Sequence, residues 1–367
     1  MSGPFGGAFR GRRVFVTGHT GFKGSWLCLW LEHLGASVTG YALAPPTAPA
    51  LFVEADVGSG LAGHVEADVR DGERLAAALE RAAPHLVLHL AAQTVVREGY
   101  RDPRETFDVN VMGTVSLLEG VRAWGRPCAV LVVTSDKCYL NVDTPGGHRE
   151  DDPLGDLTPY GGSKGAQEIV ARSYRASYFP PDRLEAHGVR LASARAGNVI
   201  GGGDWTADAL VPDVVRAVQR GESVPLRYPD AVRPWQHVLD CLDGYLTLAR
   251  SLLEGDDPAV CDAWNFGPLP GDDLPVRALV ERFLLDWGKG TFHEADGPHL
   301  PEAPALRLSI DKAREGLAWR PLWDVDTAIR ETASWYRRWL ERPESARDAC
   351  LEQIARYELG KGNQEGL

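Results

Sequence analysis

Three glycines directly after a short β-branched run constrain this chain more than any other feature. Residues 14–24 read VFVTGHTGFKG and place Gly18, Gly21 and Gly24 at intervals of three. An apolar helical pattern follows, so the stretch predicts a strand, a tight turn and the start of a helix. Backbone N–H groups at such a helix start bind anionic phosphates, and side chains on the turn would obstruct them. The sequence therefore predicts a dinucleotide site here; the alternative is a glycine-rich turn without a ligand.

Short apolar strands alternate with amphipathic helices through the first half of the chain. This alternation predicts a parallel sheet covered by helices on both faces, with ligands at the carboxyl ends of the strands. We expect an α/β fold, a Rossmann-type doubly wound parallel sheet with a smaller mixed α/β C-terminal substrate-binding region. The expected strands lie at residues 13–18, 36–43, 64–69, 85–92, 128–135 and 188–196, and expected helices include residues 71–83 and 104–125.

The regular alternation of strands and helices ends at about residue 195, after which the expected loops are longer and Gly, Pro and Trp become frequent. No Ser/Gly linker separates the two parts, so we expect one unit with a cleft between them. A helix rich in Trp and Arg is expected from about residue 325. The predicted divisions are a disordered leader over 1–10, the dinucleotide-binding Rossmann domain over 11–195, a mainly substrate-binding region over 196–358 and a disordered tail over 359–367.

The overall charge and the cysteines exclude several classes of partner. The formal net charge of −12 argues against non-specific binding to nucleic acid or to an anionic membrane. The chain contains no run of 18 apolar residues, so no transmembrane helix is expected. The first ten residues lack the apolar core of a signal peptide. The six cysteines are scattered, so we expect free thiols in a reducing compartment, the cytoplasm, and no metal site.

Tyr160 and Lys164 stand four residues apart at the start of an expected helix, directly after Pro159. This spacing puts both side chains on one face of the helix. An ammonium beside a phenol stabilises the phenolate and lowers the tyrosine pKa. The pair opens the helix after the fifth strand and so predicts a proton-transfer site, although the pattern alone also arises by chance.

Ser135, Asp136 and Lys137 follow the fifth apolar strand. The carboxyl end of a strand is the expected place for reacting groups in this fold. A hydroxyl, a carboxyl and an amine there could assist proton transfers beside Tyr160. For these three residues in isolation, a polar loop after a core strand is the favoured alternative; the neighbouring motifs favour a catalytic role.

Further side chains at the expected strand ends could bind a nucleotide. Asp68 could accept a hydrogen bond from an adenine amine, and the small Ala91 and Ala92 would allow close approach. Lys23 could reach a phosphate, and a solvated lysine at a helix start is the alternative. The candidate cofactor-binding residues are Gly18, Thr20, Gly21, Phe22, Lys23, Gly24, Asp68, Val69, Leu90, Ala91, Ala92, Tyr160 and Lys164.

Polar residues in the second half could hold a second nucleotide or a sugar. Arg233 suits a diphosphate because its forked guanidinium matches phosphate oxygens. His237 taken alone is more typical of a structural histidine. The candidate substrate-binding residues are Gln93, Asn198, Arg233 and His237.

These motifs together resemble the nucleotide-sugar 4,6-dehydratases of the extended short-chain dehydrogenase/reductase family. The resemblance covers about residues 12–325, and TSDKCY and AGNVIGGGDW are its more specific parts. The dTDP-glucose members carry Glu at the position of Lys137, and simple epimerases lack the Asp–Lys pair. The other matching stretches are VTGHTGFKGSWL, HLAAQTVVR, NVMGT, PYGGSKG, RPWQHV and WNFGP.

The resemblance implies NAD-dependent conversion of CDP-D-glucose to CDP-4-dehydro-6-deoxy-D-glucose, in deoxysugar biosynthesis that includes lipopolysaccharide O-antigen. It implies that Tyr160, helped by Ser135 and Lys164, takes the proton of the sugar 4-hydroxyl. Lys137 is then the base at C5 and Asp136 the acid for the departing 6-hydroxyl. Helices 104–124 and 160–177 would pair with a second copy in a four-helix bundle, which implies a homodimer.

One departure concerns the residues after the second strand. Residues 38–43 contain no Asp or Glu for a ribose 2′-hydroxyl and no Arg for a 2′-phosphate, so NAD is expected over NADP. Three alternatives stay open at this point. They are a nucleotide-sugar 4-epimerase, a 4,6-dehydratase for another nucleotide sugar, and a non-catalytic regulator that senses a dinucleotide.

Overall fold

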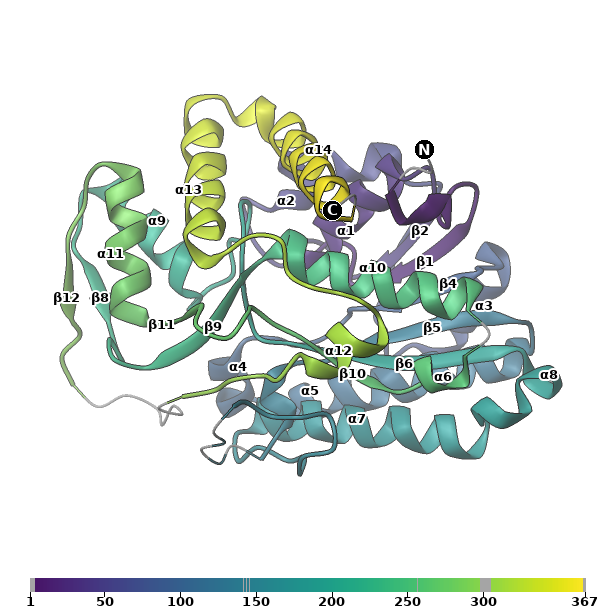
Figure 1. Cartoon of the computed structure of the whole chain (residues 1–367). Coiled ribbons are helices and arrows are strands. Elements are labelled where there is room, and N and C mark those ends of the chain that lie inside the picture. The colour runs from purple at the N-terminus through teal and green to yellow at the C-terminus, as the bar shows by residue number, and fades with distance from the viewer. Residues whose placement is uncertain are drawn as a thin grey trace.

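The central sheet of this computed structural model consists of seven parallel strands (Figure 1). The structure describes residues 4–140, 142, 144, 146–255, 257–297 and 305–365. The strand order is β10-β6-β5-β4-β1-β2-β3. The strands are β1 Arg13–Thr17, β2 Ser37–Ala42, β3 Gly63–Glu66, β4 Leu86–His89, β5 Cys128–Val133, β6 Val189–Ala196 and β10 Ala263–Phe266.

Alternate residues along each central strand pack into two separate apolar cores. In β1, Val14 and Val16 face one core and Phe15 faces the other. The first core lies under α1 (Phe22–His33) and α10 (Val238–Glu254), and the second under α3, α6 and α7. The bounds of those three helices are α3 Gly72–Ala82, α6 Gly113–Trp124 and α7 Pro159–Ser177. The predicted doubly wound sheet is therefore confirmed, and all six predicted strands are present.

A smaller mixed region extends from the carboxyl ends of the strands. It contains a three-stranded sheet, β11-β9-β7, and a strand pair, β12-β8. These strands are β7 Asn198–Ile200, β8 Val224–Leu226, β9 Val232–His237, β11 Asp273–Pro275 and β12 Phe292–Glu294. Its helices are α9 Leu210–Arg220, α11 Val276–Trp287 and α13 Val325–Glu341.

The remaining elements are short connections and the C-terminal helix. The α-helices are α2 Leu51–Glu54, α4 Val96–Arg101, α5 Pro103–Phe107, α8 Leu184–His187, α12 Asp311–Gly316 and α14 Ala346–Glu365. The 3-10 turns are η1 Pro4–Gly7, η2 Val57–Gly60, η4 Asp136–Cys138, η5 Pro181–Arg183, η6 Pro258–Val260 and η7 Pro343–Ser345, and η3 Asp108–Met112 is a π-helical turn. The single helix expected from about 325 is divided in two at Pro343, which opens η7 between α13 and α14.

The N-terminal segment is folded where the structure describes it, so the expectation of a disordered leader over 1–10 is wrong for residues 4–10. Phe5 packs its ring edge-on against Phe9 at 5.6 Å and against Trp30 of α1 at 5.9 Å. Phe9 is only 1% exposed. Two aromatic side chains thus anchor a segment whose composition had suggested disorder; residues 1–3 lie outside the described residues.

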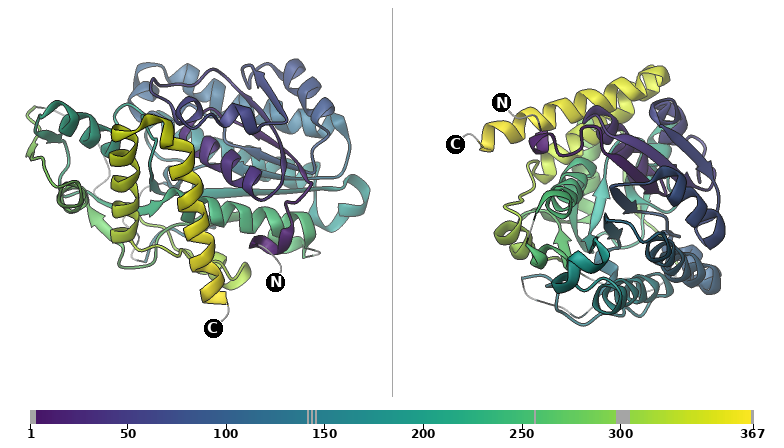
Figure 2. Two further views of the ribbon diagram at one scale, coloured as in Figure 1. Left: turned by 90° about the horizontal axis from the view of Figure 1, so that it is seen from above. Right: turned by 90° about the vertical axis from the view of Figure 1, so that its right-hand side faces the viewer.

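The expected disordered tail over 359–367 is wrong for residues 359–365, which continue α14. This helix docks on the rest of the molecule through buried polar contacts. Lys361 forms an ion pair with Asp243 of α10, and Trp30 donates to Glu358 at 2.7 Å. The N- and C-terminal segments consequently lie side by side (Figure 2), with the Lys361 ammonium 5.4 Å from the Phe5 ring centroid. Residues 366–367 lie outside the described residues.

The expected boundary between 195 and 196 does not separate two structural units. β10 and α10 belong to the later half of the chain but complete the central sheet and its cover. The chain therefore returns to the first layer after building the smaller region. Within the described residues, no helix has the length and apolar character needed to cross a membrane.

The burial of Asp240 on α10 predicts that the free energy of unfolding depends on pH. Its Oδ1 accepts hydrogen bonds from Tyr357 at 2.7 Å and from the backbone of Leu322 at 2.6 Å. Burial raises the pKa of Asp240 from 3.8 to about 7, so the folded protein keeps this carboxyl neutral where the unfolded chain ionises it. A raised folded-state pKa contributes stability at low pH that is lost as the pH rises from about 4 to about 7.

We therefore expect Asp240→Asn to remove part of this decline, because the amide stays neutral and its oxygen can accept the same bonds. Thermal unfolding at pH 5 and pH 8 measures the effect. The melting temperature of the variant relative to the parent should be higher at pH 8 than at pH 5. An identical pH dependence in both proteins would mean that Asp240 is ionised in the folded state.

Candidate active site

The glycine-rich turn between β1 and α1 packs backbone against backbone. Gly18 has a φ of +74°, and a Cβ on it would lie 2.7 Å from the backbone nitrogen of Ala91. A Cβ on Gly24 would lie 2.2 Å from the Gly18 carbonyl oxygen. Among the described residues, no side chain caps α1 after its N-cap Gly21. The turn thus leaves a backbone cradle at a helix start, which fits the pyrophosphate of a dinucleotide.

The other predicted cofactor residues surround this turn. Thr20 donates a hydrogen bond to the Leu43 carbonyl after β2 at 2.9 Å. Lys23 lies in the first turn of α1. Burial raises the pKa of Asp136 and lowers that of Lys164, and the Lys23 charge opposes the first shift and adds to the second. The cradle therefore borders the predicted catalytic residues. Phe22 opens α1, and Leu90, Ala91 and Ala92 directly follow β4 at the same edge of the sheet.

A histidine pair that the sequence interpretation missed lies beside β2. A Cβ on Gly40 would lie 2.3 Å from His19 Cδ2, so the imidazole occupies the space above this strand. His19 Nε2 lies 2.7 Å from His64 Nδ1. Burial, assisted by His64, lowers the pKa of His19 to about 4, so its ring is neutral. The sequence of β2 contains no carboxylate, and in the folded protein the neutral imidazole of His19 lies against this strand.

Asp68 is bound by a neighbouring arginine. Its carboxylate accepts hydrogen bonds from the Arg70 backbone N–H at 2.8 Å and from the guanidinium, including Nε at 3.0 Å and Nη2 at 2.6 Å. The same guanidinium also reaches Glu105 at 2.6 Å. These hydrogen bonds lower the pKa of Asp68. Val69 beside it is buried against Gly113 of α6, where a Cβ would lie 2.6 Å from Val69 Cγ1.

The structure brings Tyr160 and Lys164 together on one face of α7, as their spacing predicts. Thr158 caps this helix by accepting from the Gly161 N–H at 3.0 Å, and Pro159 fills its first turn. The Lys164 ammonium lies 6.0 Å from the Tyr160 ring centroid. Both side chains are buried, with exposed fractions of 8% and 2%.

The expectation that Lys164 lowers the Tyr160 pKa is wrong for the polypeptide alone. Burial raises the pKa of Tyr160 above its ordinary value, and a hydrogen bond with Ser135 offsets only part of that rise. Burial, with the charge of Lys23, lowers the pKa of Lys164 to about 7. Desolvation thus disfavours both charged forms, because neither the phenolate nor the ammonium is well solvated here.

Ser135, Asp136 and Lys137 form the turn η4 at the end of β5. Ser135 donates to Asp136 Oδ1 at 2.7 Å and accepts from the Lys137 N–H at 3.2 Å. Asp136 Oδ2 is buried and has no hydrogen-bond partner among the described residues. Burial raises the pKa of Asp136, although the charges of Lys137 and Arg233 oppose the rise. Asp136 is therefore a carboxyl that retains its proton more readily than an exposed one.

A cavity of about 970 Å³ opens in front of these residues, between the sheet and the smaller region. Lys137, Tyr139, Asn198 and Arg233 are among the residues that line it. Arg233 is only 3% exposed, and its Nη1 donates to the Val232 carbonyl at 2.8 Å. The structure thus brings Lys137, Asn198 and Arg233 together, as the sequence predicted.

Two of the predicted substrate residues do not line this cavity. His237 caps α10 by accepting from the Leu239 N–H at 3.2 Å, and its ring packs 4.7 Å from the Trp323 ring. Burial lowers its pKa to about 3 and leaves it a neutral structural residue. Gln93 is occupied by its own loop, donating to Thr106 at 2.7 Å and accepting from Val95. Local packing uses both side chains, and neither lines the cavity.

Charged residues on the cavity wall were missed by the sequence interpretation. Asp208 accepts from Arg97 of α4 at 3.1 Å and from Arg227 after β8 at the same distance. All three residues line the cavity, so Arg97 and Arg227 are among the guanidinium groups that line it in addition to Arg233. Their sequence separation explains why no local pattern revealed them.

A buried polar network behind the site was also missed. Glu168 of α7 accepts from Arg195 of β6 at 2.9 Å and also from Thr134 at the end of β5. Burial alone would raise the pKa of Glu168, but the Arg195 charge outweighs it and the pKa is lowered. Arg195 also donates to Tyr139 at 2.7 Å, and Tyr139 to Asn265 at 2.7 Å. The signal in sequence was the position of Glu168, four residues after Lys164.

The π-helical turn η3 places Asn110 between two parts of the site. Its Oδ1 accepts from the Gln93 N–H at 2.8 Å, and its Nδ2 donates to Ser163 at 2.8 Å. Ser163 lies between Tyr160 and Lys164 on α7, so Asn110 ties the end of β4 to the catalytic helix. Such π-helical turns occur often at functional sites.

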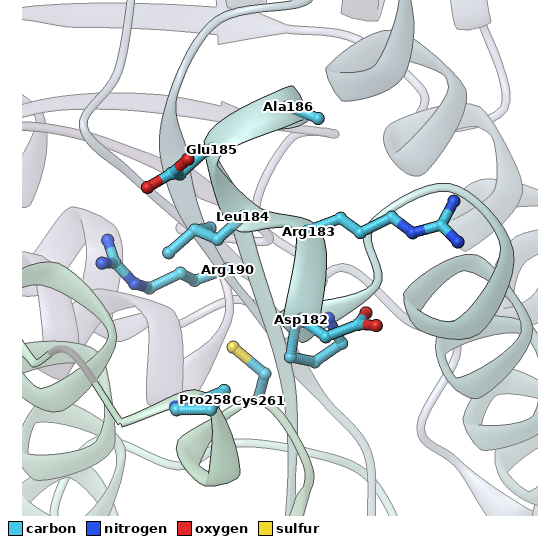
Figure 3. A pocket seen from close by; sticks show the side chains of 9 residues that line it. Asp182, Arg183, Leu184, Glu185, Ala186, Arg190, Pro258 and Cys261 are labelled. Atoms are coloured by element: carbon cyan, nitrogen blue, oxygen red, sulfur yellow. The ribbon is translucent and has the colours of Figure 1, made fainter.

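A second hollow, of about 440 Å³, is lined by none of the predicted site residues (Figure 3). It is formed around η5 and α8 and the start of β6, and its lining includes Arg190 and Cys261. Arg183, Asp182 and Glu185 give it mixed charge. Among the described residues, no group of three or more His, Cys, Asp or Glu is arranged to hold a metal ion.

Comparisons with known proteins agree with this geometry. The model of the NAD dependent epimerase/dehydratase family matches residues 14–265. The chain is 45% identical to the CDP-glucose 4,6-dehydratase of Salmonella typhimurium over 90% of this chain and 92% of that protein.

Two solved structures share the fold. The UDP-glucose 4-epimerase of Thermus thermophilus, in complex with NAD, has a TM-score of 0.75 and 26% identity, covering 89% of this chain and 99% of its own. The dTDP-glucose 4,6-dehydratase of Streptomyces venezuelae, with NAD bound, has a TM-score of 0.73 and 25% identity, covering 89% and 97%.

The Glu168–Arg195 ion pair predicts an unusually large effect of a single truncation. Glu168→Ala leaves the Arg195 guanidinium buried without its carboxylate, which should lower the free energy of unfolding by about 3–5 kcal/mol. Chemical denaturation measures this loss. Glu352→Ala is the matched control, because it removes a largely exposed pair with Arg338 at 2.6 Å and should change the same free energy by about 0–1 kcal/mol. Equal, small losses in both variants would contradict the structural role of Glu168.

Proposed function

The chain belongs to the NAD dependent epimerase/dehydratase family, and we propose that it is a hydro-lyase that converts CDP-D-glucose to CDP-4-dehydro-6-deoxy-D-glucose and water. The observation that carries this proposal is the Asp136–Lys137 pair beside Tyr160 and Lys164, in a chain 45% identical to a CDP-glucose 4,6-dehydratase. An epimerase needs the tyrosine and the lysine but has no use for an added acid and base at C5 and C6.

NAD is the cofactor of this reaction, and the backbone cradle fits it. When bound, it would supply reversible hydride transfer between C4 and C6 of the sugar. The uncapped start of α1 supports its pyrophosphate, and the close approach of Gly18 to Ala91 leaves that surface free of side chains. The residues proposed to hold it are Gly18, Thr20, Gly21, Phe22, Lys23, Gly24, Asp68, Val69, Leu90, Ala91, Ala92, Tyr160 and Lys164.

Tyr160 takes the proton from the sugar 4-hydroxyl in this proposal. It can accept a proton only as the phenolate, which burial disfavours in the polypeptide. The Lys164 ammonium, 6.0 Å from the ring centroid, supplies positive charge toward that form, and Ser135 can hydrogen-bond the same oxygen. The pair therefore works as a unit whose charge state decides the first step.

Asp136 and Lys137 carry the elimination. The new ketone at C4 acidifies the C5 proton, which Lys137 removes from its place on the cavity wall. Asp136 delivers a proton to the departing 6-hydroxyl, which suits a buried carboxyl with a raised pKa. The unpartnered Asp136 Oδ2 is the oxygen available for this proton.

The second part of the chain, residues 196–358, supplies much of the wall for the nucleotide sugar. Asn198 and Arg233 line the same cavity as Lys137, and further arginines, among them Arg97 and Arg227, add guanidinium groups. A guanidinium fork matches the oxygens of a diphosphate. The Rossmann part, residues 11–195, holds the cofactor and the reacting side chains.

We propose that the active protein is a homodimer. Large apolar side chains on η3 and α7 and at their ends are exposed: Phe107 at 40%, Met112 at 48%, Ile169 at 47% and Tyr178 at 50%. A second copy packed on this face would cover them. Static light scattering should give twice the chain mass of 40.0 kDa at micromolar concentration. A mass equal to one chain would contradict the proposal.

The proposed product is a 4-keto-6-deoxy sugar nucleotide, which places the reaction in deoxysugar biosynthesis; lipopolysaccharide O-antigen is one proposed destination. We also propose a cytoplasmic location. All six cysteines are free and buried, which suits a compartment that keeps thiols reduced.

The substrate assignment is tested by offering the purified protein CDP-, dTDP-, GDP- and UDP-glucose in parallel. We expect the alkaline absorbance of a 4-keto sugar with CDP-glucose, and kcat/KM for the other three at least about tenfold lower. A change of configuration at C4 without loss of water would identify an epimerase. Equal activity with another nucleotide sugar would mean that the enzyme is not specific for CDP-glucose. No turnover of any of the four sugars would favour a dinucleotide-sensing regulator.

Lys137→Ala should separate oxidation from elimination. Tyr160 and Lys164 are intact in this variant, so C4 is still oxidised and the absorbance of the reduced nicotinamide builds up. Release of the 4-keto-6-deoxy product should fall by about 10²–10⁴-fold, because the C5 proton has lost its base. Tyr160→Phe is the comparison, since it should suppress both signals. Product release by Lys137→Ala at the parent rate would show that this lysine is not the base.

A further inference from the structure

The ammonium of Lys164 lies in the interior of the protein beside one side-chain acceptor. Lys164 is 2% exposed, and its Nζ donates to Gln167 Oε1 at 2.9 Å. Gln167 is itself fully buried, one helical turn further along α7. A buried ammonium needs such acceptors because water no longer solvates it. The Gln167 carboxamide therefore substitutes for solvent at the catalytic lysine.

A chain of hydrogen bonds continues from Gln167 through the sheet. Gln167 Nε2 lies 2.9 Å from Thr114 Oγ1 on α6, and His89 Nε2 lies 3.1 Å from that same oxygen. His89 Nδ1 in turn lies 2.8 Å from Thr17 Oγ1. Thr17 ends β1, directly before the glycine-rich turn, and its oxygen accepts from the Ala91 N–H at 3.2 Å. The chain thus joins the catalytic helix to the predicted cofactor cradle.

The proton count fixes the direction of every bond in this chain. The Thr114 hydroxyl spends its one proton on the Asn110 carbonyl at 2.8 Å, so it can only accept from Gln167 and from His89. Gln167 must then turn its NH₂ toward Thr114 and its oxygen toward Lys164. The opposite amide orientation would set two donors against each other at Lys164 and two acceptors against each other at Thr114.

The same count assigns the tautomer of His89. Its Nε2 carries the hydrogen that Thr114 accepts, and its Nδ1 accepts from the Thr17 hydroxyl. Burial, with the nearby Lys164 charge, lowers the pKa of His89 to about 3 and keeps this ring neutral. The chain is therefore a rigid set of neutral dipoles that ends on one charged group, the Lys164 ammonium.

We propose that Gln167 is a positioning residue for the proton-transfer pair: its oriented carboxamide oxygen, held by Thr114 and His89, fixes the Lys164 ammonium and sustains its charged state beside Tyr160. The inference rests on the proposed function for the role of Lys164, but the contact itself belongs to the polypeptide. Nothing in the sequence interpretation pointed to Gln167, because its partner Thr114 lies on another helix.

The charged and titratable groups around Lys164 allow the Gln167 carboxamide to influence its charge state. Burial and the Lys23 charge lower the pKa of Lys164 to about 7, so its protonation changes within the physiological range. The carboxylate of Glu168 acts in the opposite direction but is shared with Arg195. The titratable groups that face Lys164 from α1, β4, η4 and its own helix are Lys23, His89, Cys138, Tyr160 and Glu168.

Substitutions at Gln167 should therefore shift the pKa of Lys164 in opposite directions. Gln167→Glu places a carboxylate at hydrogen-bond distance from the ammonium, and an adjacent opposite charge raises a lysine pKa by about 1–3 pH units. Gln167→Leu removes the acceptor, so the pKa of Lys164 should fall below that of the parent. Gln219→Glu on the exposed end of α9 is the matched control, because it adds the same charge far from α7.

The pKa is measured on the full chain by a pH titration of ¹³Cε-lysine NMR signals. The protein contains only six lysines, so Lys164→Arg identifies the signal by its disappearance. We expect the Lys164 signal to titrate at higher pH in Gln167→Glu, at lower pH in Gln167→Leu, and at the parent value in Gln219→Glu. An unchanged Lys164 pKa in Gln167→Glu overturns the inference, and this near-isosteric variant decides the matter even if Gln167→Leu does not fold.

The pH profile of dehydration gives the second readout. Activity that requires the ammonium should decline as the pH rises through the Lys164 pKa, so the alkaline limb of kcat should move upward in Gln167→Glu while KM for CDP-glucose stays within about twofold. A purely structural role would lower kcat without moving the limb, and that result also overturns the inference. If the parent fails to dehydrate CDP-glucose, the proposed function is wrong, and the NMR titration still decides the role of Gln167.

Discussion

The ion pair between Glu168 of α7 and Arg195 of β6 lies in the interior at 2.9 Å, and it ties the helix that carries the proposed catalytic residues Tyr160 and Lys164 to the central sheet. Its side chains are 2% and 4% exposed, and Thr134 at the end of β5 donates to the same carboxylate. A buried charge is stable only when it is paired, so this contact fixes α7 against two strands. Tyr160 and Lys164 project from α7, and the turn η4 follows β5. The pair therefore sets the distance between the two halves of the proposed mechanism.

Burial also sets the protonation states that the chemistry needs. It raises the pKa of Asp136, which suits an acid that must hold its proton until the hydroxyl departs. It lowers the pKa of Lys164 to about 7, which leaves that group sensitive to each neighbouring dipole. The neutral His89 and the oriented Gln167 then matter more than their lack of charge suggests, because hydrogen bonds are strong where water is excluded. One dry interior thus produces an acid, a responsive cation and a neutral relay of hydrogen bonds that leads from this cation to the glycine-rich turn.

The sequence predicted the features that depend on neighbours along the chain. The glycine turn, the six strands and the Tyr160–Lys164 pair are local patterns, and all are present in the structure. The errors arise where distant segments meet. His237 and Gln93 were predicted to contact the substrate, but their side chains pack against Trp323 and Thr106 and do not line the cavity. Phe9 and Lys361 belong to segments of low apolar content that fold only because α1 and α10 receive them. Glu168, Arg195 and Gln167 were missed for the same reason, since their partners lie on other strands and helices.

The most direct test of the account follows one atom through the reaction. CDP-glucose carrying deuterium at C4 is converted by the purified protein, and the position of the label in the product is read by NMR. The account predicts deuterium at C6 of the 4-keto-6-deoxy sugar, because the hydride taken from C4 returns within the same active site. Deuterium retained at C4 of an epimerised hexose, or lost altogether to solvent, would contradict the dehydratase assignment.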